Sequence, residues 1–101
     1  MGLSDDALLD FDYGRHAHWD AAKAKRDLAG PHRDLYRNHL VIARFIDGWR
    51  ERSARPRLTP REPEWYEGFE YAMREVAAHL RQGDLLPGGV LHDEQVSGKF
   101  D

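Results

Sequence analysis

PEWYEGFEYAMREVAAHLRQG, residues 63–83, is the most strongly patterned stretch of the chain. Five apolar residues recur in it at steps of four, four, three and four: Trp65, Phe69, Met73, Val76 and Leu80. This spacing places all five on one stripe of an α-helix. Charged residues occupy the opposite side, so one side suits a core and the other suits water. The stretch therefore predicts an amphipathic helix around which the other elements are arranged.

Both ends of this helix carry sequence signals. Thr59 and Glu62 lie three residues apart, as in a capping box, and Pro60 between them suits a first turn. Gly83 follows the last periodic residues and is expected to end the helix in a left-handed conformation. We therefore expect a helix over residues 60–82.

Two further helices are predicted before it. Residues 15–29 are rich in alanine and in long unbranched side chains, which favour helix, and Gly30 and Pro31 end that helix and open the next. Residues 31–53 carry a broad apolar stripe formed by Leu35, Ile42, Phe45, Ile46 and Trp49. Because so wide a stripe can contact neighbours on more than one side, we expect it in the central helix of a small bundle.

The two ends of the chain show no helical pattern. Residues 9–14 alternate apolar and acidic residues, which is typical of a strand with one buried face. This segment could pair with the region around residues 85–91, or lie on the helices as an extended arm. Residues 84–101 predict an irregular tail, and residues 1–7 and about 94–101 are expected to be mobile. The predicted fold is one mostly α domain over residues 1–101, with three helices.

Composition limits the class of protein. The 101 residues are 41% hydrophobic and 33% charged, which suits one soluble domain with one core. No apolar run approaches the roughly 20 residues that span a bilayer, and the acidic N-terminal region does not resemble a signal peptide. There is no cysteine, so disulfides, thiolate metal sites and thiol nucleophiles are excluded. We expect a cytoplasmic protein without membrane contact.

Charge is unevenly distributed along the chain. Five acids and one base give residues 1–20 a charge of −4, whereas eleven bases and four acids give residues 21–61 a charge of +7. Nine acids and three bases give residues 62–101 a charge of −6. Either oppositely charged helix faces lie beside each other, or the basic middle region binds an anionic partner or the acidic C-terminal part a cationic one. The first interpretation is the simpler one.

Residues with metal-binding or catalytic chemistry do not form a recognisable site. Carboxylates and imidazoles gather in one segment at Asp10, Asp12, His16, His18 and Asp20. The two histidines are two positions apart, which on a helix directs them to different faces, so no metal site is expected there. A zinc or manganese titration that left the melting temperature unchanged would exclude one.

Catalysis is not expected either. Glu75 and His79 lie four apart on the predicted helix, but such pairs are common on helix surfaces. No serine or threonine has the glycine-flanked setting of a nucleophile, and no glycine-rich loop opens a helix as a phosphate site requires. We expect no catalytic residue, no cofactor and no metal.

The arginine-rich segment over residues 44–61 is a candidate nucleic-acid interface. Its members at the end of the second long helix and in the following loop are Arg50, Arg52, Arg55, Arg57 and Arg61. Arginines near an aromatic residue such as Trp49 can bind phosphates and stack on bases. However, the next helix begins with several glutamates at the end that would approach DNA. Nucleic-acid binding is therefore the alternative function.

A protein-binding surface is the preferred interpretation. Eleven aromatic residues are many for a chain of this length, and exposed ones would be natural anchors for a partner. The candidate binding residues are Trp19, Tyr66, Glu67 and Glu70. The mixture of arginine-rich and glutamate-rich surfaces also favours self-association, so a homodimer is an open expectation.

One resemblance adds to this interpretation. The segment WYEGFEYAMREVAAHLRQGDLLPGG, residues 65–89, resembles small uncharacterised proteins of actinobacteria and their phages. Twelve arginines against three lysines are in keeping with that resemblance. It implies a small accessory protein, such as a phage-encoded inhibitor of a host factor or a defence complex. From the residues and the resemblance together we expect a non-enzymatic protein-binding or regulatory module.

Overall fold

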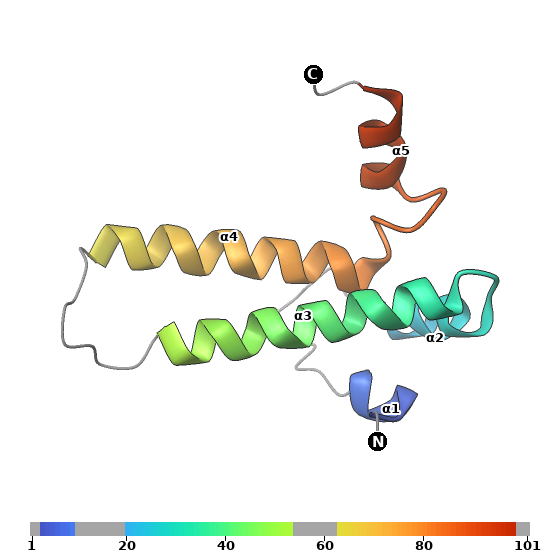
Figure 1. Cartoon of the computed structure of the whole chain (residues 1–101), viewed down its shortest axis with the longest axis horizontal. Coiled ribbons are helices and arrows are strands. Elements are labelled where there is room, and N and C mark those ends of the chain that lie inside the picture. Colours follow the sequence, from blue (N-terminus) through green and yellow to red (C-terminus); the bar gives the residue numbers. More distant parts are fainter. Residues whose placement is uncertain (1–2, 10–19, 54–62, 99–101) are drawn as a thin grey trace.

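The computed structural model describes residues 3–9, 20–53 and 63–98 of the chain. In these ranges it contains helices and no strand. The helices are α1 (Asp5–Leu8), α2 (Ala21–Ala29), α3 (Arg33–Ser53), α4 (Pro63–Gln82) and α5 (Val90–Ser97) (Figure 1). The mostly α fold predicted from the sequence is confirmed. None of these helices is long and apolar enough to cross a membrane.

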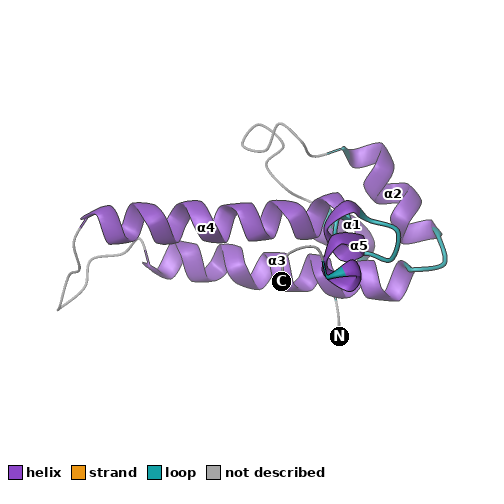
Figure 2. Ribbon diagram, turned by 90° about the horizontal axis from the view of Figure 1, so that it is seen from above, coloured by secondary structure: helices purple, strands orange, loops and turns teal. Residues whose placement is uncertain are grey.

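Helices α3 and α4 form a long antiparallel hairpin and lie side by side in both ribbon views (Figures 1 and 2). Ala43 of α3 and Ala77 of α4 are completely buried in one cluster with Ile46 and Leu80. The two alanines let the helix backbones approach closely, because they place only a methyl group between them. Met73 packs against this cluster from the side.

A second core cluster lies at the end of the hairpin remote from the α3–α4 connection, where α1 and α2 meet α3. Its members come from four parts of the chain: Leu8, Leu9, Ala24, Leu28, Tyr36, Leu40 and Leu86. The Tyr36 hydroxyl donates a hydrogen bond of 2.5 Å to the Arg81 carbonyl, which ties α3 to the last turn of α4. Because α3 packs against α1, α2 and α4, it is the central helix, as predicted.

Helix ends follow the capping rules where they are described. The Asp20 carboxylate accepts hydrogen bonds from the amides of Ala22 and Lys23 and so begins α2 later than the predicted residue 15. Residues 15–19, and the capping box expected at residues 59–62, lie outside the described ranges. Gly83 has a φ of 78°, which confirms the predicted left-handed end of α4.

Two expectations about the chain ends need correction. Residues 5–8 are not a loose end: they form α1, whose first turn is capped by the Ser4 hydroxyl, and Leu8 is buried. Residues 90–97 form α5 rather than an irregular tail. Helix α5 buries no residue completely, so its sequence needs no apolar stripe. A prediction based on apolar periodicity therefore misses this helix. The strand predicted at residues 9–14 falls mostly outside the described residues.

Candidate protein-interaction face

Several large apolar side chains of the hairpin remain exposed. Phe45 is 63% exposed, Trp49 44% and Trp65 46%. Ile42 and Val76 are exposed as well. The sequence pattern predicted all five as core residues, and this is wrong. The stripes of α3 and α4 are wider than the area that each helix covers on the other, so one edge of each stripe faces solvent.

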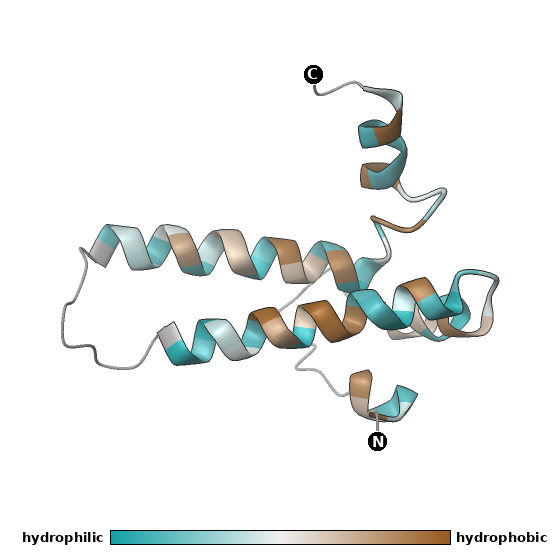
Figure 3. Ribbon diagram, viewed as in Figure 1, coloured by the Kyte–Doolittle hydropathy of each residue, from teal (hydrophilic) through white to brown (hydrophobic). Residues whose placement is uncertain are grey.

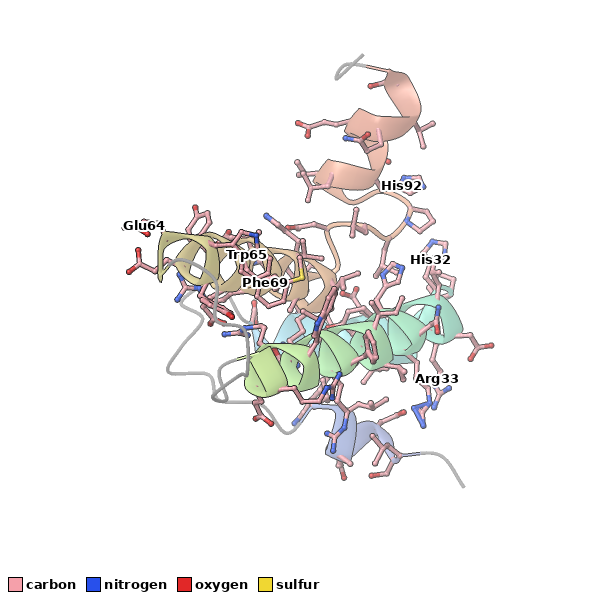
Figure 4. The ribbon with its side chains drawn as sticks, turned by 60° about the vertical axis from the view of Figure 1, so that its left-hand side comes forward. His32, Arg33, Glu64, Trp65, Phe69 and His92 are labelled. Carbon is pink, nitrogen blue, oxygen red and sulfur yellow. The ribbon has the colours of Figure 1, made fainter. Side chains whose placement is uncertain are left out.

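The exposed rings of α3 and α4 are joined across the two helices by the half-buried ring of Phe69. Trp49 of α3 meets Phe69 of α4 edge to face, with ring centroids 5.3 Å apart. Phe69 in turn stacks on Trp65 at 5.5 Å, and Phe45 lies 6.4 Å from Trp49. Figure 4 shows Trp65 and Phe69 one after the other along α4. These are favourable separations for aromatic pairs, so the rings form one continuous row that bridges the hairpin.

Aliphatic side chains extend this row along both helices. Ile42 precedes Phe45 by three positions, and Val76 follows Phe69 by seven, so each shares a helix side with the rings. We call the whole set the aromatic face: Ile42, Phe45 and Trp49 of α3 with Trp65, Phe69 and Val76 of α4. The hydropathy colouring shows hydrophobic residues in the middle of α3 beside those of α4 (Figure 3).

Charged groups stand beside the aromatic face and between the helices. The Arg52 guanidinium lies 6.0 Å from the centre of the Phe45 ring, within the range of a cation–π contact. Arg50 donates to the Glu70 carboxylate at 3.1 Å and to Asp47 at 2.8 Å. The hydrogen bond to Glu70 raises the pKa of Arg50 above its usual value. Arg50 is therefore engaged in ion pairs inside the hairpin and is not available to bind a ligand.

A buried arginine continues this polar layer. Arg81 is only 6% exposed, and one of its terminal nitrogens donates to the Asp47 carboxylate at 2.5 Å. Burial lowers the pKa of Arg81, while the hydrogen bond to Asp47 opposes that shift. Asp47 thus joins Arg50 of its own helix to Arg81 of α4. The layer aligns the two helices and with them the two halves of the aromatic face.

The predicted protein-binding residues occupy different settings. Tyr66 is half-buried and contacts the Trp65 ring at 5.2 Å. Glu70 is paired with Arg50 across the hairpin, whereas Glu67 is exposed. Trp19 lies outside the described residues. The structure thus brings Tyr66 to the edge of the aromatic face, and a partner for these residues stays a prediction.

The predicted nucleic-acid-binding arginines are only partly described. Arg50 is engaged in the polar layer and Arg52 is exposed beside Phe45. Arg55, Arg57 and Arg61 lie outside the described residues, so the alternative function stays a prediction.

The histidines and acids do not gather into a metal site in the described part of the chain, where no group of three or more ligand-type residues occurs. Of the acidic and histidine cluster at residues 10–20, only Asp20 is described, and it caps α2. His79 contacts Asp84 at 2.8 Å rather than the Glu75 suggested by the spacing. His39 carries a buried Nδ1 with no hydrogen-bond partner among the residues that the structure describes, and burial lowers the pKa of His39.

Comparison with known proteins adds no relative: no family model, no curated protein and no solved structure matches the chain. The aromatic face therefore has to be interpreted from its own chemistry. Sequence reasoning identified its residues but assigned them to the core. The sequence signal that could have indicated their exposure was the width of the apolar stripe of α3, which one neighbouring helix cannot cover.

Proposed function

We propose that this chain is a non-enzymatic protein-binding module that binds its partner through the aromatic face. The observation that carries the proposal is the continuous row of rings from Phe45 to Trp65 on the α3–α4 hairpin, in which only Phe69 is half-buried and the other rings are exposed. Contiguous exposed apolar surface of this kind is typical of protein interaction sites. Tryptophan and other aromatic residues also dominate the binding energy of protein interfaces.

The chemistry of the face favours protein over nucleic acid as the partner. Its six residues carry no formal charge, and the rings of Trp65 and Phe69 are already stacked on each other. Nucleic-acid binding would instead need rings free to stack on bases and several cations to contact phosphates. Glu64 and Glu67 stand exposed in the first turns of α4, next to Trp65, and would repel phosphates.

The same face offers no catalytic chemistry, since none of its six side chains is a nucleophile, an acid or a base. This supports a binding role rather than an enzymatic one. The narrower expectation, a phage-encoded inhibitor of a host or defence protein, stays a prediction that the identity of a captured partner would test.

A pair of matched variants tests the proposed function. Phe45→Glu places a charge in the row of rings, whereas Tyr71→Glu changes an equally exposed aromatic residue (63% and 60% exposed) on another side of α4. Tagged wild-type and variant proteins are incubated with actinobacterial lysate, with and without nuclease, and captured proteins are quantified by mass spectrometry. Self-association is measured in parallel. We expect Phe45→Glu to abolish binding, because a buried carboxylate lacks compensation, and Tyr71→Glu to retain it.

Three outcomes would contradict the proposal. One is a captured protein whose yield is the same with Phe45→Glu as with the wild type. Another is capture that disappears after nuclease treatment, which would favour the arginine-rich segment instead. The third is a wild-type chain that neither captures a protein nor associates with itself.

A further inference from the structure

We propose that the partner seated on the aromatic face is a second copy of this chain. In this arrangement two α3–α4 hairpins bring their aromatic faces together and form a four-helix bundle with a two-fold axis. The inference rests on the proposed function, because it names the occupant of the same face. Helices with a broad apolar stripe bury it most simply in such a bundle.

Charge complementarity is the first argument for a second copy. Helix α3 contains five arginines and three acids, whereas α4 contains four glutamates and two arginines. The helices therefore carry net charges of +2 and −2. A two-fold axis parallel to the helices places α3 of one copy against α4 of the other. Each basic helix then faces an acidic one at both contacts of the dimer.

The ends of the helices fit this symmetry as well. The last turn of α3 carries Arg52 and the first turn of α4 carries Glu64, and both are exposed. Because the helices of the hairpin are antiparallel, these two turns lie at the same end of the molecule (Figure 1). The same two-fold axis brings Arg52 of one copy towards Glu64 of the other. Opposite charges at the rim set the register and speed association more than they add affinity.

The second argument is the amount of exposed surface. The chain exposes 7258 Å², whereas a compact monomer of 11.7 kDa exposes about 5900 Å². A stable interface of standard size removes about 800 Å² from each partner. The Cα radius of gyration of the chain is 15.2 Å, against about 13 Å for a compact domain of this length. Part of this exposed surface lies on the aromatic face, where five of the six residues are 40–63% exposed.

The third argument is the shape of the face. From Trp65 to Val76 it runs eleven residues along α4, or about 17 Å, and Ile42 to Trp49 covers the facing part of α3. Helix α4 therefore contributes to the face over about 17 Å and α3 over about 10 Å. The two-fold axis places each residue of α3 against α4 of the other copy and repeats the same contact in reverse, so one patch serves both partners.

Sedimentation of the full chain tests the inference. The wild type, measured from micromolar to hundreds of micromolar concentration with nuclease added, is expected to sediment as a dimer. Phe45→Glu is expected to weaken the dimer by about a hundredfold or more, because symmetry places two carboxylates in the apolar interface. Tyr71→Glu should remain dimeric. Circular dichroism of each variant checks that the helices are intact.

A second pair of variants tests the placement of α3 against α4. Arg52→Glu alone should weaken the dimer, and adding Glu64→Arg should restore it, since the exchanged charges again attract. A wild type that stays monomeric at every concentration would overturn the inference. A dimer unaffected by both Phe45→Glu and Arg52→Glu would overturn it too, because another surface would then hold the copies together.

Failure of the inference can be separated from failure of the proposed function. A monomeric wild type that still captures a different protein, with the same loss in Phe45→Glu, rejects the second copy and keeps the protein-binding module. A monomer that captures nothing rejects both.

Discussion

Gly83 is a residue whose backbone conformation the fold requires. Its φ of 78° lets its amide donate to the Leu80 carbonyl at 3.3 Å, while the next amide reaches back to His79 at 3.3 Å. A Cβ atom at this position would come within 2.8 Å of both the Lys23 Nζ and the Asp27 carboxylate. Lys23 itself donates to the Gln82 carbonyl at 2.9 Å and so ties α2 to the end of α4.

Replacing Gly83 should therefore destabilise the protein. We expect Gly83→Ala to lower the free energy of unfolding by about 1–2 kcal/mol, from the left-handed backbone alone. Gly68 is the matched control: it lies inside α4, and a Cβ there would meet nothing within 4 Å. Gly68→Ala should raise the free energy of unfolding by about 0.5–1 kcal/mol. Urea titrations of both variants measure these changes, and changes of the same sign would refute this reading of the α4 cap.

At the scale of elements, a polar layer joins α3 to α4 beside the apolar cluster of Ala43 and Ala77. Asp47 lies between Arg50 and the buried Arg81, and Glu70 completes the layer from α4. Removing one partner of a buried ion pair leaves the other charge without compensation in a poorly hydrated site. Breaking these ion pairs is energetically costly. The layer therefore helps to fix the register of α3 against α4.

Asp47→Ala should lower the free energy of unfolding by about 3 kcal/mol, because the charge of Arg81 stays buried. Adding Arg81→Met should recover much of that loss, since the buried charge is then gone. Asp34, whose side chain is 97% exposed in its pair with Arg33, is the control, and Asp34→Ala should cost less than about 1 kcal/mol. Equal losses in the two single variants, by chemical denaturation, would rule out the special role of the layer.

For the whole molecule, the hairpin and the second core cluster form one body, and α5 projects from the end of α4 (Figure 1). Its attachment includes hydrogen bonds from the His92 amide to the Asp84 carbonyl, at 2.9 Å, and from the Gly88 amide to the Asp93 carboxylate, at 3.2 Å. Val90 and Val96 are exposed, and no residue of α5 is completely buried. Helix α5 therefore adds little to the core.

A chain shortened to end at Gly89 should keep the fold. Leu86, the last buried residue among those that the structure describes, is retained, so we expect the free energy of unfolding to fall by less than about 1 kcal/mol. The dimer should also persist, because α5 contributes nothing to the aromatic face. Thermal unfolding and sedimentation of the shortened chain measure both properties. A loss of several kcal/mol would instead make α5 part of the core.

Local rules account for what the sequence determined. The 3.6-residue periodicity predicted a helix over residues 60–82, of which the structure describes 63–82, and the permissive backbone of glycine predicted its end at Gly83. Residue composition, together with Gly30 and Pro31 between the two helices, also predicted α2 and α3 and their order along the chain. These features depend on neighbours along the chain, and such neighbours can be read from a sequence. Helix α5 escaped prediction because it carries no apolar stripe to reveal it.

Long-range packing settled which apolar residues are buried. Periodicity marks a residue as apolar but does not reveal how much of its stripe another helix covers. Tyr36, Ala43 and Ala77 therefore lie in the core, while Phe45 and Trp49, equally prominent in the pattern, form the candidate site. The same holds for Asp47 and Arg81, which are 34 positions apart and meet only when α3 and α4 align. The helices follow from local spacing, whereas the aromatic face exists because the hairpin covers only part of each stripe.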